Sequence, residues 1–293
     1  MADQAERLRE LTNNVRQFPR AVPEHREEKG CRVITVSSGK GGVGKTNIAA
    51  NLALSFSYLG KKVAVLDADL GLSNVNIVMG LVPPPRYNLS HIISGKKKLK
   101  EVMAEAPLGV KIIAGAVGAS EIANLAKEQR DEFIKELSTI SQFADLLIID
   151  TGAGVSNNVL DFILAAKEVI LVTTPEPTAI TDAYGMIKVI TGHEAEIDIK
   201  LIVNRASSFL EGKKVADRIA DIAGQFLSVH IEKLGYVLED PLVGKSIREQ
   251  TPFILKHPTS KAASCIKHIR NKLANVPEEP KKFTSFFSRL FKR

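Results

Sequence analysis

Between residue 31 and about residue 275, short runs of apolar residues alternate with longer stretches in which apolar residues recur every three or four positions. Short apolar runs are typical of buried strands, and the longer pattern is typical of helices. Their alternation predicts βαβ units. We expect strands at residues 32–36, 62–67, 110–115, 145–150, 168–173, 198–204 and 233–238. The predicted fold is therefore α/β, a doubly wound, mainly parallel sheet of about seven to eight strands.

The two ends of the chain follow a different pattern. Residues 3–16 predict a helix with Ala5, Leu8 and Val15 on one face, and Pro19 and Pro23 then interrupt the periodicity. A last helical pattern at 260–276 precedes a proline-containing linker. We therefore expect an N-terminal helix and linker at 1–29, one domain at 30–276, and a linker with an amphipathic helix at 277–293.

Composition is that of a globular protein, with 44% apolar residues and no tryptophan. The two cysteines, Cys31 and Cys265, are far apart in sequence, which favours neither a disulfide framework nor a cysteine metal site. The N-terminal residues are charged, and no apolar run approaches the roughly 18 residues that span a bilayer. We expect a protein of the reducing cytoplasm.

The net charge of +7 is concentrated at the C-terminal end. Of the 40 basic residues, five lie in residues 281–293, which contain no acidic residue, so the rest of the chain is close to neutral. Outside this tail the main basic cluster is residues 95–100, which we interpret as a solvated turn. This distribution argues against a nucleic-acid footprint over the whole surface, and we expect no specific nucleic-acid partner.

Residues 39–46, GKGGVGKT, match the phosphate-binding pattern G-x-x-x-x-G-K-[ST] and lie between a predicted strand and a predicted helix. Backbone N–H groups in such a loop turn toward phosphate oxygens. Lys45 would reach the outer phosphates, and the Thr46 hydroxyl would bind Mg²⁺ directly. The loop also contains Lys40, which a phosphate loop does not require. The expected phosphate-binding residues are Gly39, Lys40, Gly41, Gly42, Val43, Gly44, Lys45, Thr46 and Asn47.

A second lysine directly after the first glycine resembles the deviant phosphate loop of the MinD/ParA family of P-loop ATPases. The resemblance implies a MinD-like fold that binds ATP and Mg²⁺. It also implies that Lys40 crosses a two-fold interface and contacts the phosphates held by a second copy. Two triphosphates face to face repel each other, and one lysine from each side offsets that charge. We therefore expect a homodimer on ATP binding.

Two further segments resemble the same family, VLDADLGLSN at 65–74 and LLIIDTGAG at 146–154. In the first, the resemblance assigns Asp69 to orienting the attacking water and places Asp67 near the metal. In the second it places Asp150 on a Mg²⁺-bound water and residues 152–154 near the γ-phosphate. The catalytic residues expected are thus Asp69 and Lys40, with slow turnover because nothing in the sequence is a strong general base.

The base-binding side favours ATP over GTP. The strand that ends at Asn204-Arg205 lacks the N-K-x-D pattern that reads guanine, and the resemblance gives Asn204 a contact with adenine. The same resemblance places residues 236–241 beside the base. The expected base-side residues are Asn204, Arg205, Val237, Leu238 and Glu239. Asn47 departs from the usual family loop, which has a second threonine there.

The C-terminal segment KKFTSFFSRLFKR carries large apolar residues at helical spacing, with basic residues beside or opposite them. Such a helix suits the interface of an anionic membrane; the alternative is that the apolar stripe packs on the protein itself. We expect peripheral attachment at the inner face of the cell membrane in the ATP state. The residues concerned are Lys281, Lys282, Phe283, Phe286, Phe287, Arg289, Leu290, Phe291, Lys292 and Arg293.

The N-terminal segment DQAERLREL resembles the start of the FlhG family (also called FleN or YlxH), MinD-like regulators of flagellar number and placement. That resemblance implies stimulation of the signal-recognition-type GTPase FlhF, with Gln4 entering the partner's active site, and contact with flagellar basal-body (C-ring) components. The partner-binding residues it implies are Asp3, Gln4, Ala5, Leu8 and Arg9.

Three other functions are open to this chain, and the sequence gives an argument against each. A MinD-type regulator of the division site would leave the N-terminal extension unexplained. A ParA-type DNA-partitioning ATPase would need a basic body. An electron carrier resembling the nitrogenase iron protein would need paired cluster-binding cysteines, which the spacing of Cys31 and Cys265 does not fit.

Overall fold

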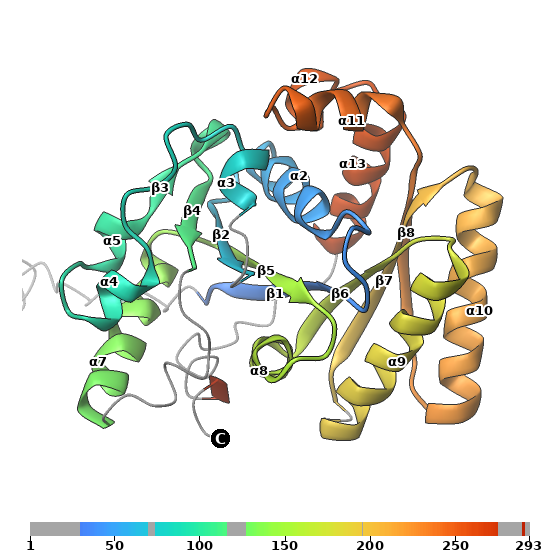
Figure 1. Ribbon diagram of the computed structural model, residues 1–293, viewed down its shortest axis with the longest axis horizontal. Helices are drawn as coiled ribbons and strands as arrows, with labels where there is room; N and C mark the ends of the chain where they lie inside the picture. Colours follow the sequence, from blue (N-terminus) through green and yellow to red (C-terminus); the bar gives the residue numbers. More distant parts are fainter. Residues whose placement is uncertain (1–29, 70–73, 116–126, 195, 275–288, 291–293) are drawn as a thin grey trace, which may run out of the picture.

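The computed structural model describes residues 30–69, 74–115, 127–194, 196–274 and 289–290. Within them, eight strands form one sheet in the order β3-β4-β2-β5-β1-β6-β7-β8, and only β3 runs antiparallel to its neighbour (Figure 1). The strands are β1 Arg32–Ser38, β2 Val63–Ala68, β3 Ala104–Glu105, β4 Lys111–Ala114, β5 Leu146–Ala153, β6 Glu168–Thr173, β7 Asp198–Ala206 and β8 Glu232–Leu238.

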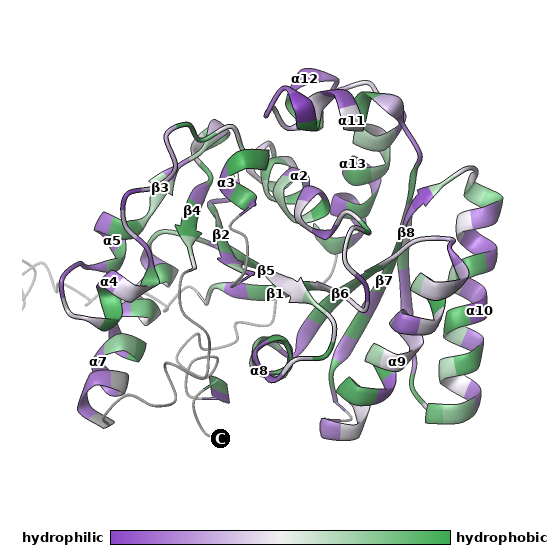
Figure 2. Cartoon of the chain, in the orientation of Figure 1, coloured by the Kyte–Doolittle hydropathy of each residue, from purple (hydrophilic) through white to green (hydrophobic). Residues whose placement is uncertain are grey.

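This arrangement confirms the predicted fold class, and each of the seven predicted strands is present. The eighth, β3, was not predicted because two residues are too short to show a period. The central strands are buried on both faces, which is why they read as continuous apolar runs; β2 and β6 are buried at every position. Figure 2 shows these strands as mainly hydrophobic at the centre of the molecule.

Helices cover both faces of the sheet. One hydrophobic cluster packs α2 (Lys45–Ser57) and α13 (Lys261–Ala274) on one face, and two others pack α7 (Lys127–Ser138), α8 (Asn157–Ala166), α9 (Pro177–His193) and α10 (Phe209–Leu227) on the other. The shorter helices are α3 Val75–Val78, α4 Leu89–Ile93, α5 Leu99–Val102, α11 Pro241–Arg248 and α12 Phe253–Lys256.

The strand order reverses direction at β1, with β5 on one side and β6 on the other. In open α/β sheets, the loops that follow the strands on either side of such a reversal diverge and leave a crevice. The loop between β1 and α2 therefore lies at the position where this fold binds ligands (Figure 1). None of the helices within the described ranges has the length and apolar character needed to cross a bilayer.

Candidate nucleotide-binding site

The loop between β1 and α2 has the backbone of a phosphate cradle. Gly42 and Gly44 have φ of 77° and 93°, in the left-handed region that other residues rarely adopt, and helix α2 begins at the next residue, Lys45. A Cβ atom on Gly39 would lie 2.4 Å from the backbone oxygen of Asp182 in α9, so the start of the loop is pressed against that helix. Close packing and backbone conformation thus fix the loop at both ends.

Two carboxylates from neighbouring strands face each other beside this loop. Asp67 in β2 and Asp150 in β5 are directly opposite in the parallel ladder, and each is 1% exposed. Backbone N–H groups of Asp69 and Val75 donate to the Asp67 carboxylate, at 3.2 and 3.3 Å. Asp67 is therefore held in place by the segment that follows its own strand.

Asp150 is in a different condition. Neither of its carboxylate oxygens has a hydrogen-bond partner among the described residues, and the Lys45 ammonium lies 3.9 Å from Oδ1. Burial raises the pKa of Asp150 to about 7 despite the attraction of Lys45, and the nearby Asp67 and Asp69 also raise it. A buried carboxylate that accepts no hydrogen bond is costly, and a hydrated divalent cation beside the loop would supply donors to it. The residues present therefore fit Mg²⁺, and the direct contact of Thr46 with the metal stays a prediction.

Asp69 lies half-buried just beyond the end of β2. A Cβ atom on Gly152 would be 3.6 Å from Asp69 Oδ1, so the carboxylate faces the backbone at the end of β5. There the N–H of Gly154 donates to the carbonyl of Ser38 at 2.8 Å, which joins the end of β5 to the start of the phosphate loop. The structure thus brings together Asp67, Asp69, Asp150 and the loop, as the sequence predicted for one crevice.

Lys40 contacts α9. Its ammonium donates to the Thr178 hydroxyl at 2.8 Å and lies 3.4 Å from the Glu176 carboxylate, and its side chain is 40% exposed. Glu176 and Thr178 were not identified from the sequence, because they lie 136 and 138 residues beyond Lys40 and no local spacing links them. The two lysines of the loop therefore differ: Lys45 is buried beside Asp150, and Lys40 lies at the surface.

Comparisons with known proteins agree with this site. The family model described as ParA, NUBPL iron-transfer P-loop NTPase, matches residues 30–274. Antiactivator FleN of Pseudomonas aeruginosa is 37% identical over 87% of this chain and 91% of its own length. Flagellum site-determining protein YlxH of Helicobacter pylori is 34% identical over 100% of this chain and 99% of its own.

The chain belongs to the ParA family of P-loop ATPases. Its similarity to FleN and YlxH also confirms the resemblance to the FlhG group that the sequence indicated. Among solved structures, the septum site-determining protein MinD of Pyrococcus horikoshii, complexed with Mg-ADP, is 25% identical with a TM-score of 0.67 and covers 84% of this chain and 97% of that one. The protein is thus a nucleotide-binding ATPase, and a relative of the same fold holds its nucleotide with Mg²⁺.

On the base-binding side of this ParA-family site, the Asn204 amide donates to the carbonyl of Val43 in the phosphate loop at 2.7 Å. This bond orients the side chain of Asn204 against the phosphate loop, and its contact with adenine stays a prediction. Arg205 follows with a positive φ of 55° and is exposed. Val237 packs its side chain in the core at 2% exposure, so a contact with a base would come from its backbone.

Two residues of the basic tail are described, and they lie on the body of the ParA-family domain. Leu290 is 6% exposed in the same cluster as Phe162 and Ala166 of α8, and the Arg289 guanidinium Nε donates to the carbonyl of Ala165 at 3.1 Å. This is the packing alternative that the sequence left open. These contacts place Arg289 and Leu290 on α8, the helix that follows residues 152–154.

The other residues expected to bind membrane or partner lie outside the described residues, and their roles stay predictions. They are Lys281, Lys282, Phe283, Phe286, Phe287, Phe291, Lys292 and Arg293 in the tail, and Asp3, Gln4, Ala5, Leu8 and Arg9 at the N-terminal end.

Proposed function

We propose that this ATPase is a dimerising switch that binds the membrane in its ATP state and regulates flagellar number and placement. ATP joins two copies through Lys40, the dimer attaches to anionic lipid through two C-terminal helices, and hydrolysis separates the copies. The names of FleN and YlxH, an antiactivator and a flagellum site-determining protein, support the flagellar role. A role in division-site selection, as in MinD, is the alternative.

The observation that carries this proposal is the position of Lys40. Lys45 already supplies a buried ammonium to the site, whereas Lys40 rests on Glu176 and Thr178 at the surface. An exposed ion pair of this kind contributes about 0–1 kcal/mol, so a triphosphate on a facing copy competes for the lysine easily. Charge-assisted contacts with phosphate are stronger and are made only when both sites are filled.

Within one site, different residues have different roles in phosphoryl transfer. Lys45 and the loop backbone bind the phosphates, and Asp69 beside Gly152 aligns the attacking water. Thr46 directly, and Asp67 and Asp150 through water, would hold a bound Mg²⁺, which would offset the charge of the phosphates. Asp69 aligns water and is not a strong base, which is consistent with the slow turnover of a switch.

Tail packing offers a way to couple nucleotide to membrane. Leu290 and Arg289 rest on α8, which begins three residues after Gly154 at the phosphate edge. A change in residues 152–154 on ATP binding would therefore act on the helix that holds the tail. Two released tails on one dimer make the second insertion intramolecular, which raises avidity by about 10²–10⁴.

Dimerisation is tested by sedimentation velocity with a non-hydrolysable ATP analogue. We expect wild type to be dimeric with the analogue and monomeric with ADP, Asp69→Ala to behave as wild type, and Lys40→Ala to stay monomeric while still binding nucleotide. Lys96→Ala, which removes an exposed lysine of the 95–100 segment, is the matched control. A wild-type protein that remains monomeric when saturated with the analogue contradicts the proposal.

Membrane binding is tested by co-sedimentation with vesicles rich in anionic lipid. Wild type should sediment with ATP and not with ADP, and deletion of residues 281–293 should abolish sedimentation without affecting the dimer. Equal sedimentation with ATP and with ADP would contradict the proposed nucleotide-dependent switch.

Deletion of residues 1–29 should abolish stimulation of FlhF while ATP turnover is unchanged; intact stimulation would refute the predicted role of Gln4. ATP-dependent, salt-sensitive binding to DNA would favour the DNA-partitioning alternative.

A further inference from the structure

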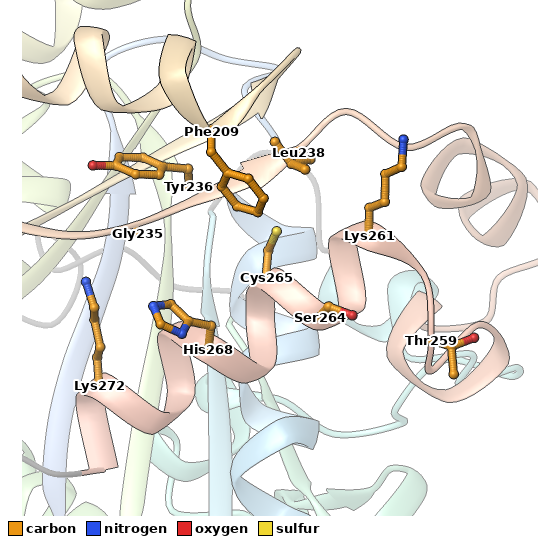
Figure 3. A pocket seen from close by; sticks show the side chains of 10 residues that line it. All are labelled: Phe209, Gly235, Tyr236, Leu238, Thr259, Lys261, Ser264, Cys265, His268 and Lys272. Atoms are coloured by element: carbon orange, nitrogen blue, oxygen red, sulfur yellow. The ribbon is translucent and has the colours of Figure 1, made fainter.

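An open groove runs along β8 at the edge of the sheet. In the strand order, β8 is three positions from β1, which precedes the nucleotide loop. β8 is the last strand in the order, and within the described ranges it pairs only with β7. Helices α10 and α13 pack on β8 from opposite faces of the sheet, and the groove between them has a volume of about 540 Å³ (Figure 3). A seven-residue edge strand thus borders a cavity.

The walls of the groove come from both faces of the sheet and are apolar at the base. Tyr236 belongs to the cluster beneath α9 and α10, whereas Cys265 belongs to the cluster beneath α2 and α13. Phe209, at the start of α10, stands 59% exposed on the groove wall. Burial raises the pKa of the Cys265 thiol, so that group stays neutral and contributes an apolar surface.

Tyr236 has little freedom to close the groove. A Cβ atom on Gly212 of α10 would lie 2.8 Å from Cγ of Tyr236, so the ring is held by a helix that approaches closely at a glycine. Gly235, the residue before it, is backed on the α13 side by Ile269, whose Cγ1 would be 2.7 Å from a Cβ there. The middle of the edge strand is therefore firmly placed, with its backbone at the base of the groove.

The rim of the groove is basic. Lys261, His268 and Lys272 lie on one exposed face of α13 and line the groove, and none of the ten lining residues is acidic. Figure 3 shows these side chains on the same side of α13, toward β8. Asp240, two residues beyond the end of β8, accepts hydrogen bonds from the backbone N–H groups of Leu242 and Ala262 at 3.0 and 3.2 Å, and its charge acts on Cys265 at that end of the groove. Along α13, a ligand in the groove meets the ammonium groups of Lys261 and Lys272.

We propose that this groove binds an extended, acidic segment of a partner protein, which adds to the sheet along β8. An edge strand offers backbone N–H and C=O groups to such a segment, and alternate side chains enter apolar pockets. The dimensions agree: Lys261 to Lys272 spans about 17 Å of helix, which matches about five residues of extended chain. Apolar side chains of the segment pack on Phe209 and Tyr236, and carboxylates face Lys261 and Lys272.

This inference does not depend on dimerisation or on the membrane, because the groove lies within one copy and away from Lys40. It is tested with the full-length protein in ADP. The probe is a fluorescein-labelled, N-acetylated hexapeptide that alternates Glu with Val and Leu, and the matched probe carries Lys in place of each Glu. Binding is followed by fluorescence anisotropy, and the site is located by hydrogen exchange at Gly235 and Tyr236.

We expect the acidic peptide to bind at least about tenfold more tightly than the basic one and to slow exchange of the β8 amides. The double variant Lys261→Glu and Lys272→Glu should lower its affinity by about tenfold or more. The control double variant Lys96→Glu and Lys214→Glu makes the same charge change at exposed lysines outside the groove and should have no effect.

Four results would overturn the proposal. The first is failure of the acidic peptide to bind at millimolar concentration, and the second is equal binding of the two peptides. The third is protection of β8 in the protein alone that disappears when residues 1–29 or 281–293 are deleted, because the chain's own segment would then fill the groove. The fourth is protection that rises with protein concentration, because a second copy would then be the occupant.

Discussion

Charged residues are buried in different conditions at the N-terminal and C-terminal ends of the strands of the parallel sheet. At the N-terminal ends, Glu168 and Lys200 are 5% and 2% exposed, and each is paired within the protein. Arg32 Nη2 lies 2.6 Å from Glu168, and the Lys200 ammonium lies 2.7 Å from Glu232 and also bonds Asp198. At the C-terminal ends, Asp150 is as deeply buried and has no hydrogen-bond partner among the described residues.

This difference distinguishes the charges of Glu168 and Lys200, which stabilise the fold, from the charge of Asp150, which is available to a ligand. The network at the N-terminal ends connects the first residues of β1, β6, β7 and β8, so it fixes how four strands start. Burial alone would lower the pKa of Lys200, but its bonds to Asp198 and Glu232 outweigh burial and raise it. Asp150, by contrast, keeps a raised pKa because its loss of water outweighs the opposing effects of Lys45 and Thr46.

The largest effect is expected from breaking the paired end. Arg32→Ala removes the guanidinium that bonds Glu168 at 3.0 and 2.6 Å and leaves this buried carboxylate, among the described residues, with only Lys200 at 3.8 Å. Loss of one partner from a buried pair costs about 3–5 kcal/mol. The free energy of unfolding from urea denaturation should fall by that amount, with ATP affinity unchanged. Lys233→Ala, at an exposed pair with Asp217, is the control and should cost less than about 1 kcal/mol. Similar losses in both variants would show that burial of the network is unimportant.

Next in size is removal of Lys45, the cation beside Asp150. Lys45→Ala deletes a buried ammonium that we predict to bind phosphate, and we expect it to weaken ATP binding by about 3 kcal/mol, or roughly 100-fold. Isothermal titration calorimetry measures this directly. Lys40→Ala serves as the internal comparison, since it should leave the affinity of one copy within about threefold of wild type. Unchanged affinity in Lys45→Ala would mean that this end of the sheet does not hold the phosphates.

The smallest effect concerns pH. Because the pKa of Asp150 is raised in the folded protein to about 7, the folded state binds more protons than the unfolded state above the ordinary pKa, and stability falls as pH rises. Between pH 6 and pH 8, the free energy of unfolding of the nucleotide-free protein should fall by about 1.4 kcal/mol because of this group. Asp150→Asn should remove this dependence of stability on pH. A slope that persists in Asp150→Asn, followed by urea denaturation, would assign it to another group.

Much of the site could be predicted because its parts are short and local. The phosphate loop is a single run of eight residues between a strand and a helix, so its glycines and Lys45 are recognisable without the fold. Asp67, Asp69 and Asp150 could be placed in one crevice because parallel strands end at the same edge of a sheet. The contact of Lys40 with Thr178 and Glu176 could not be predicted in this way, because it depends on how α9 crosses the loop.

The sequence by itself determined the elements and the chemistry: which runs are strands, which loop binds phosphate, and which residues carry charge. These depend on periodicity and on backbone conformation over a few residues, and both properties are determined by residues that are neighbours in the sequence. Tertiary structure alone decided which buried charges are satisfied, where Leu290 rests, and that an edge strand lies beside a basic groove. The physical reason is that burial and pairing depend on neighbours distant in the chain: Glu168 meets Arg32 across 136 residues and Arg289 meets Ala165 across 124.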